Sequence, residues 1–117
     1  MNWQSFGERY VRMTWRQQLG NLASTLARLS SRCSRPEHDL LVTHLLREAA
    51  LLIEWGAPHT PSAVHPDLAA MQREVLAWRD HWPLDQARPL LALRARQMSE
   101  ALLRMAGLTG TTEWQSN

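Results

Sequence analysis

The most apolar helical pattern in the chain lies at residues 40–55, which read LLVTHLLREAALLIEW. On a helix that turns by about 100° per residue, the apolar positions cover more than half of the circumference. Such a helix cannot bury its apolar surface along one narrow seam, so it needs neighbouring helices on two or three sides. We therefore predict that this helix lies at the centre of the fold. Its apolar positions are Leu40, Leu41, Val42, Leu45, Leu46, Ala49, Ala50, Leu52, Ile53 and Trp55, and its polar strip is Thr43, His44, Arg47, Glu48 and Glu54.

Two apolar stripes precede this helix, and they project to nearly opposite sides of a helix axis. The first has spacings of three, four and three, and consists of Trp3, Phe6, Tyr10 and Met13. The second has spacings of four and three, as in packed helices, and consists of Val11, Trp15, Leu19, Leu22, Leu26, Leu29 and Cys33. Capping-box patterns begin at Ser5 and at Thr14. We predict a short helix over 4–13 and a long one over 14–32, either separate or continuous with a kink.

Start and stop signals bound the central helix. Ser34-Arg35-Pro36-Glu37 fits a capping box at its beginning. Gly56 is placed to end it in the left-handed conformation. A proline-rich loop over 57–66 follows.

Two further helices follow this loop. The first of them is predicted to begin at Pro66 and to end before Pro83. The other begins near Asp85, or nearer Arg88 because of Pro89, and ends at Gly107. The apolar seam of the helix that begins at Pro66 is Leu68, Met71, Val75, Trp78 and Trp82, and that of the last helix is Leu91, Ala95, Met98, Leu102 and Met105.

These elements predict an all-α fold, namely a four-helix up-down bundle with an additional N-terminal helical segment. No stretch alternates with a period of two, so no strand is predicted. We expect one helical domain over 1–108 and a flexible C-terminal tail over 109–117, because the last residues are short, polar and rich in Gly and Thr.

Charge and composition add limits on partners and location. The formal charge of +2 is too weak to indicate nucleic-acid binding by itself, and all 13 basic residues are arginine. Cys33 is the only cysteine, which excludes an intrachain disulfide. No apolar run approaches the roughly 20 residues of a membrane span, and charges near the N-terminus interrupt any signal-peptide core. We expect a cytoplasmic protein without a transmembrane segment.

Catalytic and metal-binding motifs are not found in the sequence. There is no phosphate-binding loop, dinucleotide glycine pattern, HExxH motif or nucleophile elbow. His44 and Glu48 lie one helical turn apart but supply only two ligands, so we interpret them as a solvated pair. His59 and His65 lie in the proline-rich loop without a full ligand set. Cys33 continues an apolar seam and is interpreted as a core thiol. We predict a protein that is not an enzyme, without catalytic residues, cofactor or metal.

The distribution of arginine is the most informative charge pattern. No acidic residue occurs between Glu8 and Glu37, whereas six arginines do. The arginines near the end of the predicted helix over 14–32 are explained by the helix dipole, because positive charge is favourable at the C-terminus of a helix. The others, Arg9, Arg12 and Arg16, form a row beside the aromatic stripe. A solvated face explains this row without a partner, and an anionic partner is the alternative.

These patterns favour an interaction module, such as a small assembly factor, adaptor or regulatory subunit. It would present a helix face to a protein partner, or to a second copy in a dimer. The alternative is a nucleic-acid-binding regulator that uses the arginine row, and a third is a bundle that holds an apolar ligand. The first stripe either folds back on its own bundle or docks on a partner, and aromatic and arginine residues favour docking. The candidate partner-binding residues are Trp3, Phe6, Arg9, Tyr10, Arg12, Met13 and Arg16.

Overall fold

The computed structural model describes residues 2–107, in which all regular secondary structure is helical. The α-helices are α1 (Trp3–Tyr10), α2 (Trp15–Arg32), α3 (Asp39–Gly56), α4 (His65–His81) and α5 (Arg88–Met105). Short 3-10 helices lie in the connections at Pro36–His38, Ala57–His59, Ser62–Val64 and Asp85–Ala87. The predicted all-α class is therefore confirmed. The predicted tail over 109–117 lies outside the described residues.

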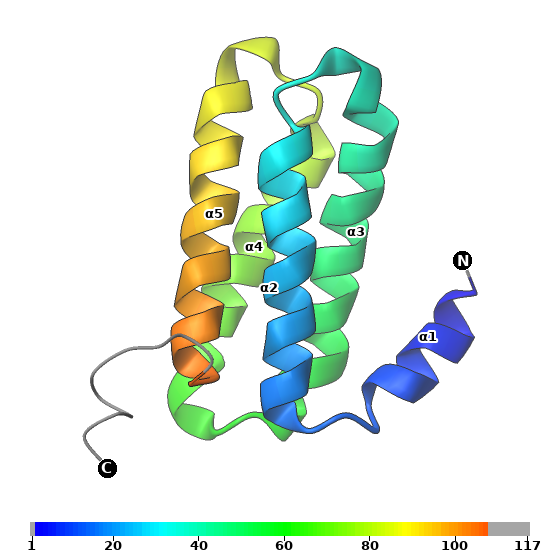
Figure 1. The fold of residues 1–117 in the computed structure, drawn as a ribbon, viewed down its shortest axis with the longest axis vertical. Coiled ribbons are helices and arrows are strands. Elements are labelled where there is room, and N and C mark those ends of the chain that lie inside the picture. Colours follow the sequence, from blue (N-terminus) through cyan, green and yellow to red (C-terminus); the bar gives the residue numbers. More distant parts are fainter. Residues whose placement is uncertain (1, 108–117) are drawn as a thin grey trace.

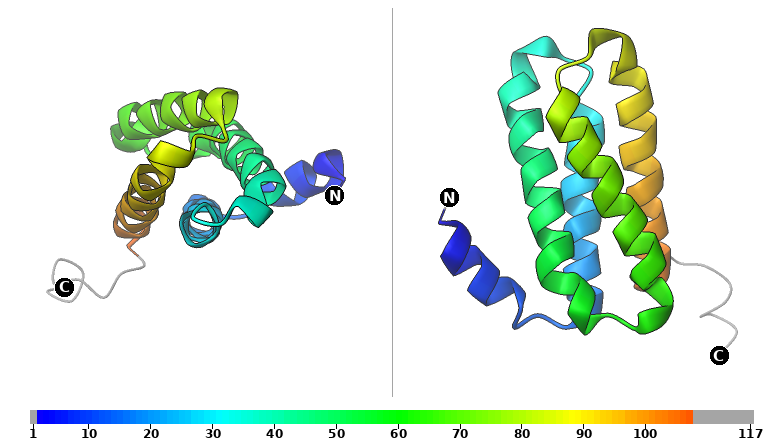
Figure 2. Two further views of the ribbon diagram at one scale, coloured as in Figure 1. Left: turned by 90° about the horizontal axis from the view of Figure 1, so that it is seen from above. Right: turned by 180° about the vertical axis from the view of Figure 1, so that it is seen from behind.

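The four long helices alternate in direction, and α1 projects from one end of them (Figure 1). Helix α5 packs on α2, while α2 and α4 both pack on α3. The view from above shows α3 and α5 on either side of α2, with α4 running obliquely from the side of α3 towards that of α5 (Figure 2). The sequence of packed neighbours is thus α5, α2, α3 and α4, and the side between α4 and α5 is not closed by tight helix packing.

Small residues explain why α5 lies so close to α2. Ala23 and Ala95 are fully buried on the two helices. The hydroxyl of Ser99 donates to the carbonyl of Ala23 at 2.8 Å, and that of Ser30 donates to the carbonyl of Ala92 at 2.7 Å. Short side chains let two helix backbones approach, and these hydrogen bonds satisfy the hydroxyls that the approach buries.

Helix α3 occupies the centre of the fold, as its apolar pattern predicts. It contacts α1, α2 and α4, and its buried apolar residues are Val42, Leu45, Leu46, Ala49, Ala50, Leu52 and Ile53. Two of the predicted core positions are wrong, because Leu40 is 89% exposed and Leu41 is also exposed. Leu40 shares one helix face with His44 and Arg47, and this face is turned to solvent.

The predicted helix ends are only partly confirmed. Thr14 and Gln17 form the predicted reciprocal capping box at the start of α2. The box at Ser5 is wrong, because Asn2 caps α1 by accepting a hydrogen bond from the backbone N–H of Ser5. The box at Ser34 is also wrong, because a 3-10 turn without a side-chain cap precedes α3.

The two terminal glycines behave differently. Gly107 has a φ of 70°, so it is in the predicted left-handed conformation after α5. Gly56 has a φ of −93° and is the last residue of α3, so the prediction of a left-handed cap there is wrong. A Cβ atom at Gly56 would lie 3.2 Å from the ring of Tyr10. Close packing of α1 therefore explains the glycine at this position.

A cluster around the buried side chain of Arg88 joins several helix ends. The guanidinium donates to both carboxylate oxygens of Asp39 at 2.7 and 2.9 Å, and to Asp85 at 2.7 Å. It also donates to the carbonyl of Cys33 at 3.0 Å and lies 5.0 Å from the ring of Trp82. These hydrogen bonds from Arg88 lower the pKa of the Asp39 carboxyl. One side chain thus ties together the end of α2 and the beginnings of α3 and α5.

Substitution of Leu45 or Leu52 by Ala is expected to lower the free energy of unfolding by about 2–5 kcal/mol, the usual cost of deleting a buried leucine side chain. Both side chains are almost fully buried on α3. Leu40→Ala on the same helix is the matched control and should change stability little. Chemical denaturation followed by circular dichroism measures all three. Equal effects for the three variants would contradict the central position of α3.

Stability should also depend on the charge of Asp39. Because its pKa is lowered in the folded state, the carboxylate stabilises the fold above its unfolded pKa of about 3.9, and this contribution is lost as the pH falls below that value. Asp39→Asn should therefore lower the melting temperature at neutral pH and flatten its decline below about pH 4. Asp80→Asn removes an exposed carboxylate and is the control. Parallel pH profiles for wild type and Asp39→Asn would show that the ion pair does not stabilise the fold.

Candidate functional site

The aromatic stripe of α1 packs on α3 rather than facing solvent. Tyr10 is only 1% exposed. Its hydroxyl donates to the carbonyl of Gln18 at 2.6 Å, and the side-chain amide of Gln18 donates to the carbonyl of Tyr10 at 2.9 Å. Burial raises the pKa of the Tyr10 phenol above its ordinary value. This reciprocal pair fixes the end of α1 to the beginning of α2.

Trp55, near the C-terminal end of α3, contacts Phe6 and Tyr10 of this stripe. Phe6 meets the Trp55 ring edge-on with centroids 5.9 Å apart, and Tyr10 lies 6.3 Å from the same ring. A Cβ atom at Gly7 would lie 3.2 Å from Trp55, so α1 sits directly on the indole. The stripe therefore folds back on its own bundle, the alternative to docking that the sequence left open. Tyr10 in particular has no surface to offer a partner in this arrangement.

The arginine row next to the stripe does face solvent. Arg9, Arg12 and Arg16 are all exposed, and Met13 is half-buried beside them. The guanidinium of Arg16 lies 4.5 Å above the ring of Trp15, and that of Arg9 lies 5.9 Å from Phe6. The row thus forms a cationic edge where α1 meets α2. Its role in binding a partner stays a prediction.

The structure separates His44 and Glu48, which the sequence analysis interprets as a solvated pair. Glu48 is buried between α2 and α3, where it accepts hydrogen bonds from Thr25 at 2.6 Å and from Arg28 at 3.1 Å. The interpretation of His44 and Glu48 as a solvated pair is therefore wrong for Glu48, because position 48 lies on the face of α3 that packs on α2. His44 is exposed.

Neither the histidines nor the cysteine forms a reactive cluster in the described part of the chain. The Nε2 atom of His65 lies 3.1 Å from the carbonyl oxygen of Thr60. No group of three or more His, Cys, Asp or Glu side chains in residues 2–107 is arranged to hold a metal ion. Cys33 is fully buried, and burial raises the pKa of its thiol, which suits a core position and not a nucleophile.

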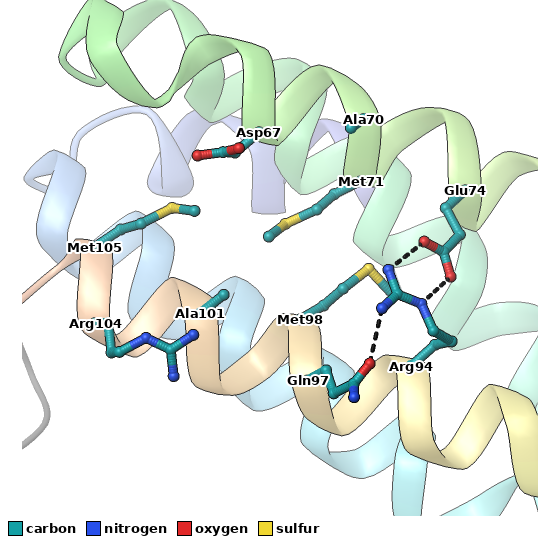
Figure 3. Close-up of a pocket in the computed structure, with 10 residues that line it drawn as sticks. All are labelled: Asp67, Ala70, Met71, Glu74, Arg94, Gln97, Met98, Ala101, Arg104 and Met105. Atoms are coloured by element: carbon teal, nitrogen blue, oxygen red, sulfur yellow. Dashed lines mark hydrogen bonds and ion pairs between the residues drawn. The ribbon is translucent and has the colours of Figure 1, made fainter.

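A cleft with a volume of about 440 Å³ lies between α4 and α5. Side chains from both helices point into it (Figure 3). Met71, Met98 and Met105 supply its apolar surface together with Ala70 and Ala101. Polar side chains lie around it, and these are Asp67, Glu74, Arg94, Gln97 and Arg104.

An ion pair crosses the cleft between the two helices. Arg94 donates to both carboxylate oxygens of Glu74, at 2.7 and 2.9 Å, and its remaining nitrogen donates to Gln97 at 2.7 Å (Figure 3). The hydrogen bonds from Arg94 lower the pKa of Glu74. The indole N–H of Trp78 donates to the same carboxylate at 3.3 Å. The pair therefore joins α4 to α5 at mid-length while the helices stay apart.

A smaller hollow continues the cleft beyond this ion pair. It has a volume of about 200 Å³ and is lined by Glu74, Ala77, Trp78, His81 and Leu84. Glu74 belongs to both hollows, so the two lie along one groove that the ion pair divides. The exposed residues of α4 along this groove include Ala70 and Ala77, whereas Met71 is only 9% exposed.

Sequence reasoning did not find this cleft, although it singled out its methionines. Met71, Met98 and Met105 were predicted as seam residues, and the same three-four spacing serves a closed core and an open groove equally well. The small side chains at Ala70 and Ala101 are the one signal in the sequence for a space between the helices. That signal becomes informative only when α4 and α5 are known to face each other.

Comparison with protein-family models, with curated proteins and with solved structures finds no significant match to the chain. None of the described helices is both long enough and apolar enough to cross a membrane. A functional proposal for this protein therefore rests on the geometry of its own side chains.

Removing the Tyr10 hydroxyl should weaken the attachment of α1. Tyr10→Phe is expected to lower the free energy of unfolding by about 1 kcal/mol, the net value of one buried hydrogen bond. Val11→Ala changes an exposed neighbour and is the control. Denaturant unfolding gives the stability, and Trp fluorescence reports the environment of Trp55. Identical unfolding curves for Tyr10→Phe and wild type would contradict the reciprocal bonding with Gln18.

Proposed function

We propose that this protein is a non-enzymatic protein-interaction module, such as an assembly factor, adaptor or regulatory subunit. In this proposal its four long helices are an up-down bundle that is open between α4 and α5, with α1 as an added helix. The open side receives an amphipathic helix of a protein partner. The observation that carries the proposal is the methionine-lined cleft between these two helices.

The chemistry of the cleft suits an apolar helix face. Methionine side chains are flexible and polarisable, so they adapt to partner side chains of different shape and are common on binding surfaces of this kind. A groove between two helices is the usual site for the apolar face of a third helix. Met105 and Ala101 are only half-buried in the cleft. Covering their apolar surface with a partner helix would be favourable, because it removes that surface from water.

The polar side chains around the cleft provide the rim that interfaces generally have. Asp67 and Arg104 lie on opposite helices at the end of the cleft near the C-terminus of α5. The ion pair between Glu74 and Arg94 crosses the groove at the middle of the two helices. It therefore limits how deeply a bound helix can enter there. A bound helix therefore contacts the methionines in the larger hollow, on one side of the ion pair, and Trp78 and Leu84 in the smaller hollow on its other side.

A second candidate function is favoured by the exposed row of Arg9, Arg12 and Arg16. Guanidinium groups on one edge suit the phosphates of a nucleic acid, and this is the alternative that the sequence analysis left open. The two functions differ in their response to salt. Phosphate contacts weaken steeply as salt rises, whereas an apolar cleft responds little.

Ala70→Glu should abolish binding of a partner in the cleft, because it places a charged side chain among the methionines. Ala70 is exposed at the cleft, so the substitution should not unfold the protein. Ala69→Glu is the matched control, since Ala69 is exposed on the same helix but does not line the cleft. Pull-down from extracts of the native host, analysed by mass spectrometry at low and moderate salt, measures the retained proteins.

The expected result is a protein that wild type and Ala69→Glu retain at both salt concentrations and that Ala70→Glu loses. Retention by all three variants would show that the cleft is not the binding site. Retention of nucleic acid that disappears at moderate salt, and that depends on Arg9, Arg12 and Arg16, would support the second candidate instead.

A further inference from the structure

A second groove lies on the side of α4 that is turned to α3. It consists of two adjoining hollows with volumes of about 390 Å³ and 280 Å³. Arg47 of α3 and Arg79 of α4 line both hollows, so these two residues lie where the hollows adjoin. The first hollow is completed by Leu40, Thr43 and His44, and the second by Ala50, Leu51, Glu54, Gln72 and Leu76.

The first hollow has a cationic lining without an acidic residue. Arg47 makes no hydrogen bond or ion pair with any residue in the described part of the chain. Arg79 has a long contact of 3.6 Å with its neighbour Asp80, and both side chains are exposed. An exposed pair of this kind neutralises little of the charge. Glu54 is the acidic group of the groove and lines the second hollow together with both arginines, whereas no carboxylate lines the first hollow.

Apolar groups lie directly beside these cations. The ring of Trp3 lies 5.2 Å from that of His44, and the guanidinium of Arg47 lies 5.9 Å from the same indole. Leu40 is the most exposed of the large apolar side chains in the described residues. The packing of α1 on α3 thus places an aromatic ring next to His44 and Arg47, two of the residues that line the hollow.

We propose that this groove is a docking site for an acidic segment of a protein partner, one in which carboxylates flank a bulky apolar side chain. Arg47 and Arg79 bind the carboxylates, because a guanidinium matches a carboxylate with two parallel hydrogen bonds. Leu40 receives the apolar side chain.

The size of the cationic group favours a peptide over a nucleic acid. Duplex DNA carries one phosphate charge for about every 1.7 Å of its axis, so its binding sites need an extended track of cations. Here two arginines and one histidine occupy a single hollow, with Leu40 beside them. An acidic peptide with an apolar anchor matches both the charge and the apolar wall.

This docking site goes beyond the proposed function and does not depend on it. The groove uses the face of α4 that meets α3, whereas the methionine-lined cleft uses the face that meets α5. Ala70→Glu should therefore leave binding in this groove unchanged, and loss of this groove should leave the cleft intact.

The test uses a short fluorescein-labelled peptide in which leucine is flanked by glutamates, with fluorescence anisotropy as the readout. The double variant Arg47→Gln with Arg79→Gln should raise the dissociation constant about five- to tenfold, as expected for the loss of two exposed ion pairs. The double variant Arg73→Gln with Arg96→Gln removes the same charge from exposed positions outside the groove and should have little effect.

The apolar part of the site has its own matched pair of variants. Leu40→Ser should weaken binding, whereas Leu90→Ser, at another exposed leucine on α5, should not. A peptide with glutamines in place of the glutamates should bind weakly to wild type. On the wild-type protein, titration with the glutamate peptide should shift the backbone amide resonances of residues 40–47 and 76–80 most strongly.

Three results would overturn the proposal. Equal weakening by the two double-arginine variants would show that only overall charge matters. Amide shifts confined to other surfaces would place the peptide elsewhere. Tighter binding of a labelled DNA duplex than of the peptide, lost with Arg47 and Arg79, would assign the groove to nucleic acid. Circular dichroism on each variant verifies that the exposed substitutions leave the helices intact.

Discussion

The guanidinium of Arg88 is the interaction on which the arrangement of the helix ends depends. It comes from the first residue of α5, yet its hydrogen bonds reach the end of α2 and the first turn of α3. Buried charge is tolerated only where it is paired and hydrogen-bonded, and here two carboxylates and a carbonyl meet that requirement. Helix α5 is thereby directed along α2, where small residues hold it close. Helix α4 follows α3, and the open side between α4 and α5 is the result.

This arrangement gives α4 two accessible faces with different chemistry. Toward α5 it presents Met71 and Ala70 to an apolar cleft. Toward α3 it presents Arg79 to a cationic groove. Because α4 packs tightly on α3 alone, it can expose an apolar strip on one side and a cationic strip on the other. Two such strips would allow two partners to bind separately.

The helices themselves could be predicted from the sequence because three-four apolar spacing and capping residues are local signals. The seam of α2 is confirmed from Leu19 to Cys33, and the box at Thr14 is confirmed as well. What failed depends on tertiary neighbours. Gly56 ends α3 as predicted but not in the left-handed conformation, and the position of Tyr10 explains the glycine there. Glu48 looks solvated in a helical projection, and its burial follows from Thr25 and Arg28 on another helix.

The candidate sites were less accessible to sequence reasoning than the fold for the same reason. Arg47 and Arg79 lie far apart in the chain, and their meeting in one hollow requires α3 and α4 to be placed. The row of Arg9, Arg12 and Arg16 was visible because its members are neighbours on one segment. The burial of the adjacent stripe, in contrast, depends on its contacts with Trp55, and no local pattern connects Trp55 with that stripe.

The position of the only cysteine has a practical consequence. The Sγ atom of Cys33 lies 3.7 Å from the carbonyl of Arg88, and its own carbonyl is bound by the same arginine. A thiol reagent can therefore reach this sulfur only when the end of the bundle around Arg88 opens. With no other cysteine in the chain, the rate of alkylation measures how often that end opens under native conditions, without any label or substitution.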